Sequence, residues 1–174
     1  MGIDDVRIEI NPVITDEELF SFYQRNHICE EGYGRIEYPY LRKSSLVIGA
    51  FESEKLVGIA RAMFDGMAGV IMEFCLELEY QGTHLEYENG SLIGKDDYGL
   101  GKRMGCTLIN ELFRMGADFI DLPSIVENYE ESFYESIGFE RKDSHLRYYI
   151  DNRPYKDDER YKTIRRTFTD EMSR

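Results

Sequence analysis

Three strand-like runs follow one another between residues 45 and 80, and they constrain the fold more than any other feature of the chain. Residues 45–53 (SLVIGAFES) and 55–64 (KLVGIARAMF) are apolar and are joined by a tight polar turn around Ser53 and Glu54, which predicts a β-hairpin. The third run, at 70–80 (VIMEFCLELEY), alternates apolar and polar residues with a period of two. Consecutive strands of this kind predict an antiparallel sheet.

The alternation at 70–80 divides this predicted strand into an apolar face and a mostly acidic face. The apolar face holds Met72, Phe74, Leu76, Leu78 and Tyr80, and the other face holds Glu73, Cys75, Glu77 and Glu79. We expect the apolar face to meet the core, and the acidic face to be wet or to line a cleft.

Other elements precede and follow the three runs. A short strand at 6–11 leads to Thr15 and, three residues later, to Glu18, a capping-box pattern that predicts a helix start. After Gly101 the apolar spacing becomes helical, and Gly116 ends that helix. The remaining pattern predicts a buried strand at 117–124, a helix at 128–137 stopped by Gly138, and two closing strands at 139–143 and 144–150.

Together these elements predict one α/β (α+β) domain that spans residues 1–150. Its central sheet is expected to be mixed and mostly antiparallel, with helices on both faces. Residues 151–174 are highly charged and lack a strong strand pattern, so we expect a tail that forms a peripheral helix or a loose end. A chain of 174 residues is long enough to bury a core without metal or disulfide staples.

Composition excludes several classes of protein. The net charge of −13 disfavours binding to nucleic acid and to anionic membranes, and weakly favours cationic small molecules. The sequence has no run of about 18 apolar residues and no signal-peptide pattern at its start. Three cysteines and three histidines without ligand spacing predict no disulfide framework and no metal site. We therefore expect a cytoplasmic protein.

Residues 95–105 (KDDYGLGKRMG) form a glycine loop that opens the helix after Gly101. Gly99 and Gly101 allow a sharp turn that exposes backbone N–H groups, and a helix start attracts anions. Lys102 and Arg103 add positive charge, so the loop suits a pyrophosphate. The alternative is a glycine cap that only eases a tight connection. A third glycine at the Rossmann spacing is absent, and so is a P-loop.

Two motifs resemble those of the GNAT family of acetyl-CoA-dependent N-acetyltransferases. The phosphate loop of that family, [QR]xxGx[GA], falls on Asp96, Gly99 and Gly101, and its later motif, Asn…[FLA]YxxxGF, falls on residues 128–139 (NYEESFYESIGF). The resemblance covers residues 6–150. The sequence departs from the family at Asp96, which replaces Gln or Arg, and in an insertion after EYQG at 79–82.

The resemblance implies transfer of an acetyl group from acetyl-CoA to a primary amine by direct attack in a ternary complex. Tyr134 matches the family's general acid, and an unperturbed tyrosine keeps its proton at neutral pH. Glu73 is the first candidate for general base and Glu77 the second. The residues implied in donor binding are Cys75, Leu76, Glu77, Tyr98, Gly99, Leu100, Gly101, Lys102, Arg103, Asn128 and Tyr134.

Alternatives stay open for most of these residues. Tyr134 also fits helix packing, Asn128 also fits a helix cap, and the glutamates also fit a merely solvated face. Asp96 either caps the helix or turns toward solvent, and its charge supports a second hypothesis, an acyl-CoA-binding module without catalysis. Segments 28–44 and 81–98 are expected to shape the site for a small amine or a peptide amine, with 81–98 acting as a flap or a homodimer contact.

Overall fold

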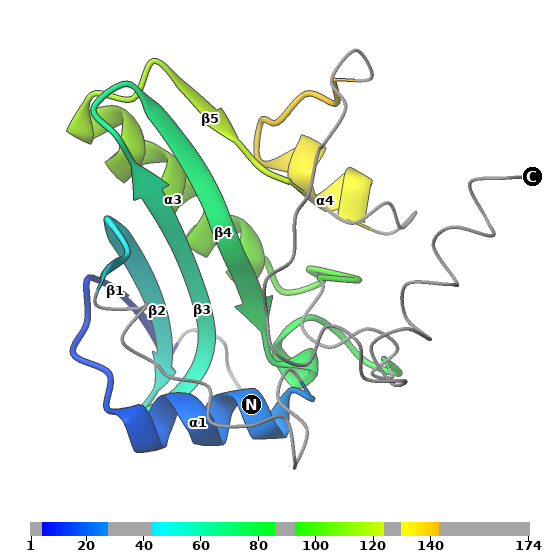
Figure 1. The fold of residues 1–174 in the computed structure, drawn as a ribbon. Coiled ribbons are helices and arrows are strands. Elements are labelled where there is room, and N and C mark those ends of the chain that lie inside the picture. Colours follow the sequence, from blue (N-terminus) through cyan, green and yellow to red (C-terminus); the bar gives the residue numbers. More distant parts are fainter. Residues whose placement is uncertain (1–4, 28–42, 86–92, 124–129, 143–174) are drawn as a thin grey trace, which may run out of the picture. The chain divides into compact units, whose positions relative to one another are not determined.

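The computed structural model describes residues 5–27, 43–85, 93–123 and 130–142 (Figure 1). Residues up to Arg141 form one compact unit, and the second unit, from Lys142 on, lies almost entirely outside the described residues. The elements in chain order are β1 (Val6–Ile10), α1 (Asp16–Arg25), β2 (Leu46–Glu52), β3 (Lys55–Phe64), β4 (Ala68–Leu76), the short 3₁₀ helix η2 (Leu78–Tyr80), α3 (Leu100–Met115), β5 (Phe119–Asp121) and α4 (Glu130–Ser136).

The strands form one sheet in the order β1-β2-β3-β4-β5. Neighbouring strands from β1 to β4 are antiparallel, and β5 joins β4 in parallel. The predicted hairpin is confirmed, with Ser53 at a positive φ of 52° in its turn. At the next turn, backbone N–H groups of Met67 and Ala68 donate to the Asp65 carboxylate, and these bonds lower the pKa of Asp65. The predicted mixed, mostly antiparallel sheet is confirmed.

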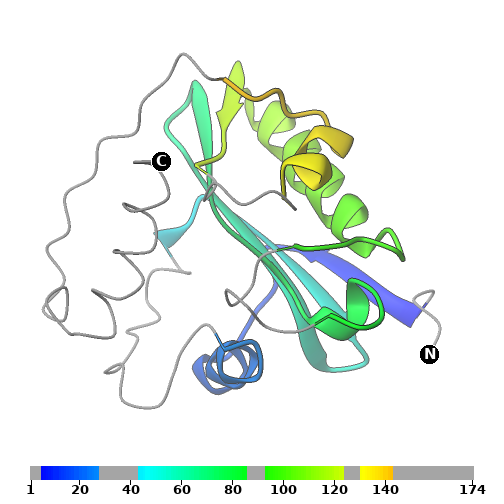
Figure 2. The same ribbon diagram turned by 90° about the vertical axis from the view of Figure 1, so that its right-hand side faces the viewer.

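Helices cover both faces of this sheet, as predicted, with α1 on one side and α3 on the other (Figure 2). On the α1 side, buried Leu19, Phe22 and Tyr23 pack against residues of β2, β3 and β4, including Cys75. The larger core lies on the α3 side, where Leu100, Met104, Leu108 and Leu112 meet the opposite faces of the strands. The helix α1 begins where the capping box predicts, because the Thr15 hydroxyl accepts the N–H of Glu18 at 3.1 Å.

The alternation predicted for the third strand is wrong at Met72. The pairing of β3 with β4 shifts there, because Arg61 faces Glu73 while the next residue, Ala62, faces Ile71. Met72 is the extra residue of this β-bulge. Phe74 and Leu76 reach the α3-side core as predicted, but Met72 is 49% exposed. A bulge moves one residue out of the period-two pattern, which the residue types alone do not reveal.

Other boundaries also differ from the sequence prediction. The strand expected at 70–80 ends at Leu76, and η2 follows it. The strand expected to be buried at 117–124 is β5, which has three residues and an exposed Phe119 and is the last strand of the sheet within the described residues. Residues 139–142 are not strand in the structure, although a closing strand was expected there.

Two glycines on α3, Gly101 and Gly105, allow side chains of α4 and the residue after it to approach closely. A Cβ at Gly101 would lie 3.0 Å from the Phe133 ring, and a Cβ at Gly105 would lie 2.8 Å from Cδ1 of Ile137. The two positions are one helical turn apart and form a shallow face that receives α4. Gly116 ends α3 in the left-handed conformation, with φ of 107°, as predicted.

Several predictions concern residues outside the described part of the chain. They are the loop at 28–42, the central part of the insertion at 86–92 with its flap or homodimer role, Asn128, the closing strand at 144–150 and the tail at 151–174. Within the described ranges, none of the helices is both long enough and apolar enough to cross a membrane.

Candidate active site

The glycine loop leads directly into α3, as the sequence predicts. Gly99 adopts the left-handed conformation, with φ of 74°, immediately before the helix begins at Leu100. Its N–H donates to the carbonyl of Asp96 at 3.1 Å, and its own carbonyl accepts the N–H of Arg103. A side chain at this φ would be strained, so glycine is needed at position 99 for backbone conformation.

The Asp96 carboxylate caps this helix start. The N–H of Gly101 donates to Oδ1 at 2.8 Å, and the N–H of Lys102 donates to Oδ2 at 2.7 Å. The sequence leaves open whether Asp96 caps the helix or turns toward solvent, and in the structure it caps the helix. The chain's own carboxylate therefore already occupies two of the N–H groups that the sequence assigns to a pyrophosphate.

The two ends of the 81–98 insertion meet beside this loop. The N–H of Asp97 donates to the carbonyl of Gln81 at 2.8 Å, and the Asp97 carboxylate lies where a side chain on Gly82 would be. The Gln81 side chain is buried and holds both ends. Its amide donates to the carbonyl of Leu76, and its oxygen accepts the N–H of Gly94.

Within the part of the chain that the structure describes, β5 pairs with the beginning of β4. Pairing in the described residues runs from Ala68 with Phe119 to Val70 with Asp121. The Glu77 N–H donates to Val57 of β3 at 2.9 Å, so by strand alternation the Leu76 N–H points away from β3. A donor arm expected along Cys75–Glu77 would thus meet the backbone of Leu76. The Cys75 side chain is buried under α1, as its interpretation as a small packing residue predicts.

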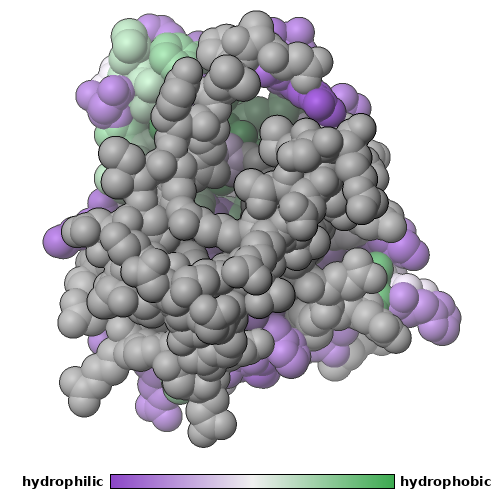
Figure 3. Space-filling view, turned by 45° about the vertical axis from the view of Figure 1, so that its right-hand side comes forward, coloured by the Kyte–Doolittle hydropathy of each residue, from purple (hydrophilic) through white to green (hydrophobic). Residues whose placement is uncertain are grey.

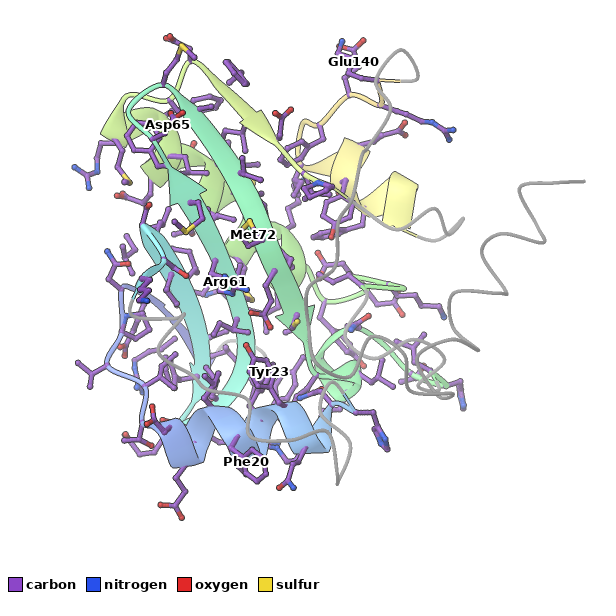
Figure 4. The ribbon with its side chains drawn as sticks, viewed as in Figure 1. Phe20, Tyr23, Arg61, Asp65, Met72 and Glu140 are labelled. Carbon is purple, nitrogen blue, oxygen red and sulfur yellow. The ribbon has the colours of Figure 1, made fainter. Side chains whose placement is uncertain are left out.

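Glu73 lies at the junction of α1, β3 and β4. Its Oε2 accepts the Tyr23 hydroxyl at 2.8 Å and the Arg61 Nε–H at 2.7 Å, while the Cys75 thiol lies 3.5 Å from Oε1. The Glu73 side chain is 13% exposed. Tyr23 projects from α1 toward the strands, and Arg61 and Met72 lie on the sheet face above it (Figure 4). Three elements therefore hold one carboxylate in a defined orientation.

Glu77 has a different environment from Glu73. Its side chain is 6% exposed, and its two oxygens accept bonds from Arg25 Nε at 2.9 Å and Lys55 Nζ at 2.7 Å. Partial burial opposes the shift, but the bonds to Glu77 and Glu79 raise the pKa of Lys55. Both Glu77 oxygens are thus engaged by cations that join the end of α1 to the hairpin. These contacts favour an anchoring role.

Tyr134 lies on α4, half-buried among aromatic rings. Its ring makes edge contacts with Phe133 at 5.2 Å and Phe139 at 6.2 Å between centroids. Phe133 in turn contacts Phe74 of β4 at 5.5 Å and packs against Gly101 of α3. The Phe133 side chain therefore contacts β4 and the glycine loop and joins both to α4, the helix that carries Tyr134.

The other predicted donor-binding residues differ in what they offer. Tyr98 and Lys102 have exposed side chains, whereas Leu100 is buried in the core. The Arg103 guanidinium donates to the carbonyl of Val6 in β1 at 3.2 Å, so this contact directs it away from the loop. Asn128 lies outside the described residues.

Sequence reasoning missed Tyr23, Arg61 and Gln81. Tyr23 is 50 residues from Glu73, and no local pattern links the two. Arg61 interrupts an otherwise apolar strand, which is a signal for a buried partner of opposite charge. Gln81 lies in the EYQG segment where the insertion begins, and that position is a sequence signal for a residue that holds the insertion. In the described ranges, no group of three or more Cys, His, Asp or Glu side chains could hold a metal ion.

No protein-family model matches the sequence, and no curated protein matches it either. Solved structures do resemble it. A GNAT-family acetyltransferase from Streptococcus pneumoniae is 17% identical, with a TM-score of 0.62, and the match covers 85% of this chain and 99% of that one. An aminoglycoside acetyltransferase from an uncultured soil metagenomic sample, solved with trehalose, is 15% identical, with a TM-score of 0.60 and coverages of 86% and 99%.

A third similar structure is glucosamine-6-phosphate N-acetyltransferase from Arabidopsis thaliana, at 18% identity and a TM-score of 0.57, covering 83% of this chain and 99% of that one. Identities this low do not allow residue roles to be transferred from these structures to this chain. The match nevertheless spans nearly the full length of each of these structures. The mostly antiparallel sheet flanked by helices agrees with this likeness. The chain therefore has the fold of the GNAT acetyltransferases.

Proposed function

We propose that the protein is an N-acetyltransferase that moves the acetyl group of acetyl-CoA to a primary amine. The observation that carries this proposal is the convergence at Phe133, which packs α4 and its Tyr134 against β4 and the glycine loop. These are the three elements that the resemblance assigns to acid catalysis, the pantetheine arm and the pyrophosphate. The likeness to solved acetyltransferases supports acyl transfer as the class of reaction.

Acetyl-CoA would supply an activated acetyl thioester. The amine nitrogen bonds to the carbonyl carbon as the carbon–sulfur bond breaks. In our proposal Glu73 accepts the amine proton, directly or through water, and Tyr134 gives its phenolic proton to the departing sulfur. Holding the two reactants together contributes most to the rate enhancement, because effective molarities of about 10⁵–10⁸ M exceed the roughly 10²–10⁴-fold acceleration from a general base.

The acceptor is proposed to be a small, cationic amine. The net charge of −13 attracts cations over long range, and Glu73 places an anionic side chain on the α1 side of β4. Hydrophobic residues are exposed at the end of the sheet that holds the β3–β4 turn (Figure 3). The exposed hydrophobic residues of β3, β4, β5 and the β3–β4 turn are Met63, Met67, Met72 and Phe119. The similar structures include aminoglycoside and glucosamine-6-phosphate acetyltransferases, which supports an amine of this size.

The Tyr134→Phe variant tests the proposed acid. Removing the hydroxyl takes away the proton that stabilises the leaving thiolate, so turnover should fall by about 10²-fold or more while CoA binding survives. Turnover is measured as thiol released from acetyl-CoA, and CoA binding by calorimetry. Tyr80→Phe is the matched control, because Tyr80 has no proposed role in proton transfer or donor binding and its loss of a hydroxyl should leave turnover unchanged.

Full activity in Tyr134→Phe would mean that Tyr134 is only a packing residue of α4. The acceptor class is found by the same thiol assay over amino sugars, polyamines, amino acids and peptides. Saturable turnover of one class supports the enzyme. Binding of CoA without turnover of any amine would instead support the second candidate, a GNAT-fold module that holds acyl-CoA. Two observations favour this candidate: the negative charge of Asp96 in the glycine loop, and the binding of both Glu77 oxygens by cations.

A further inference from the structure

Two of the first amides of α3, where the proposed donor would place its pyrophosphate, are already bonded to a carboxylate of the chain itself. The first N–H groups of a helix have no partner within it. Here the Arg103 N–H is used by Gly99, and the Gly101 and Lys102 N–H groups are used by the two oxygens of Asp96. The carboxylate thus binds in the way that a phosphate would bind.

Asp96 and a pyrophosphate cannot both use these donors. Each N–H makes one strong bond, and charge-assisted bonds of this length are among the stronger ones in proteins. A phosphate at hydrogen-bond distance from the same two amides would also lie within a few ångströms of the carboxylate, and two negative charges at that separation repel. Binding of one therefore requires the other to leave.

The cap is built into the loop and is not the chance orientation of one side chain. Beside the two side-chain bonds, the Asp96 carbonyl accepts the Gly99 N–H, and the Asp97 N–H is held by Gln81. Gly101 is enclosed on two sides, because a Cβ there would lie 3.1 Å from Asp96 Oδ1 and 3.0 Å from the Phe133 ring. The resting loop therefore stabilises the carboxylate in place.

We propose that Asp96 is the residue that sets donor specificity: it closes the pyrophosphate position, so that CoA binds only when the carboxylate swings away. This inference rests on the proposed function. It predicts that the wild-type protein binds CoA little better than pantetheine, which carries the same thiol arm without the pyrophosphate. Lys102, which is exposed beside the cap, is then free to meet the phosphates once Asp96 has moved.

The test compares the affinity for CoA and for pantetheine at one fixed ionic strength, by calorimetry. Asp96→Ala removes both bonds, and we expect it to tighten CoA binding at least about tenfold while pantetheine changes less than about twofold. Asp96→Asn keeps the size and part of the cap, and should give an intermediate gain even if the alanine variant folds poorly. Asp97→Ala is the matched control, since it removes the same charge one residue away and should gain less than about threefold.

Each outcome decides one question. Equal CoA affinity in wild type, Asp96→Ala and Asp96→Asn, or an equal gain in Asp97→Ala, overturns the inference and leaves the proposed function standing. Tighter CoA binding by the Asp96 variants with no acetylation of any amine upholds the inference and removes the proposed enzyme. If no variant binds either ligand, both proposals fall.

Discussion

Glu73 and Glu77 lie on the same predicted face four residues apart, yet their contacts separate their roles. Glu73 has one oxygen engaged by Tyr23 and Arg61, and its Oε1 meets only the weak thiol donor of Cys75 among the bonds to described residues. Glu77 has both oxygens bound to cations, Arg25 and Lys55. A carboxylate whose two oxygens are held by cations is poorly suited to accept a proton from an amine, so Glu73 fits the proposed base better.

The same substitution at the two positions should therefore have different effects. Glu73→Gln is expected to lower turnover per folded molecule by about 10²-fold or more, because it removes the proposed base. Glu77→Gln should lower the free energy of unfolding by about 1–3 kcal/mol, because the two cations lose a buried anion, and should leave turnover per folded molecule near wild type. Thiol release and urea unfolding measure the two effects, with circular dichroism to confirm folding. A large loss of turnover in Glu77→Gln alone would reverse the assignment.

At the scale of elements, α3 is shaped as much by its contacts with α4 as by any ligand. Gly101 was expected to shape the loop, but both it and Gly105 leave room for residues of the following segment, Phe133 and Ile137. The sheet shows the same effect at the bulge of β4, where Met72 leaves the core side and Glu73 faces Arg61. Packing between elements therefore explains residues that local patterns assign to function or to alternation.

A double-mutant cycle tests the contact between α3 and α4. Gly105→Ala alone gains about 1 kcal/mol of helix propensity, but its Cβ meets Ile137 Cδ1 at 2.8 Å, so the net change in unfolding free energy should be small. Ile137→Val alone should cost about 0.5–1.5 kcal/mol. In the Ile137→Val background the crowding methyl is gone, and Gly105→Ala should become stabilising.

The expected coupling between these two positions is at least about 0.5 kcal/mol, measured by urea unfolding. Asn110→Ala is the control, because Asn110 is exposed on α3 and should be additive with Ile137→Val. Strict additivity of Gly105→Ala with Ile137→Val would show that the helices adjust without strain at this contact.

At the scale of the whole described unit, the most unusual buried group is the hydroxyl of Tyr80. Tyr80 is 4% exposed, and its hydroxyl has no hydrogen-bond partner of good geometry among the described residues. Burial raises the pKa of the Tyr80 phenol, and the nearby carboxylates of Glu52, Glu79 and Glu77 raise it further. Its ring faces Lys55 Nζ at 5.9 Å, a contact that a phenylalanine would keep.

Stability should therefore fall at alkaline pH. Tyrosines of the unfolded chain lose their protons from about pH 10, while Tyr80 keeps its proton in the folded state, so unfolding releases a proton there and is favoured as the pH rises. Tyr80→Phe removes the phenol and therefore this contribution to the pH dependence of stability. Urea midpoints of the two proteins should be similar at pH 8, or slightly higher for Tyr80→Phe, and should separate in favour of Tyr80→Phe above pH 10. Parallel curves across that range would contradict the raised pKa.

The described fold could largely be predicted from the sequence, and its details could not. The hairpin, the capping box at Thr15 and the helix from the glycine loop to Gly116 depend on residues within a few positions of one another. The bulge at Met72 and the exposure of Phe119 depend on which strand lies alongside, and no pattern within β4 or β5 encodes that neighbour.

The candidate site divides in the same way. The sequence by itself determined most of the described helices and strands and their order, the glycine at position 99 before α3, and Asp96 three residues ahead of it, because periodicity, capping and turn chemistry are local. Only the tertiary structure decided what each acid does. Asp96 closes onto the amides of Gly101 and Lys102, Glu73 meets Tyr23 from 50 residues away, and Glu77 meets Arg25 from 52 residues away. A carboxylate accepts whichever donors the fold brings within about 3 Å, and that choice is made by packing over the whole chain.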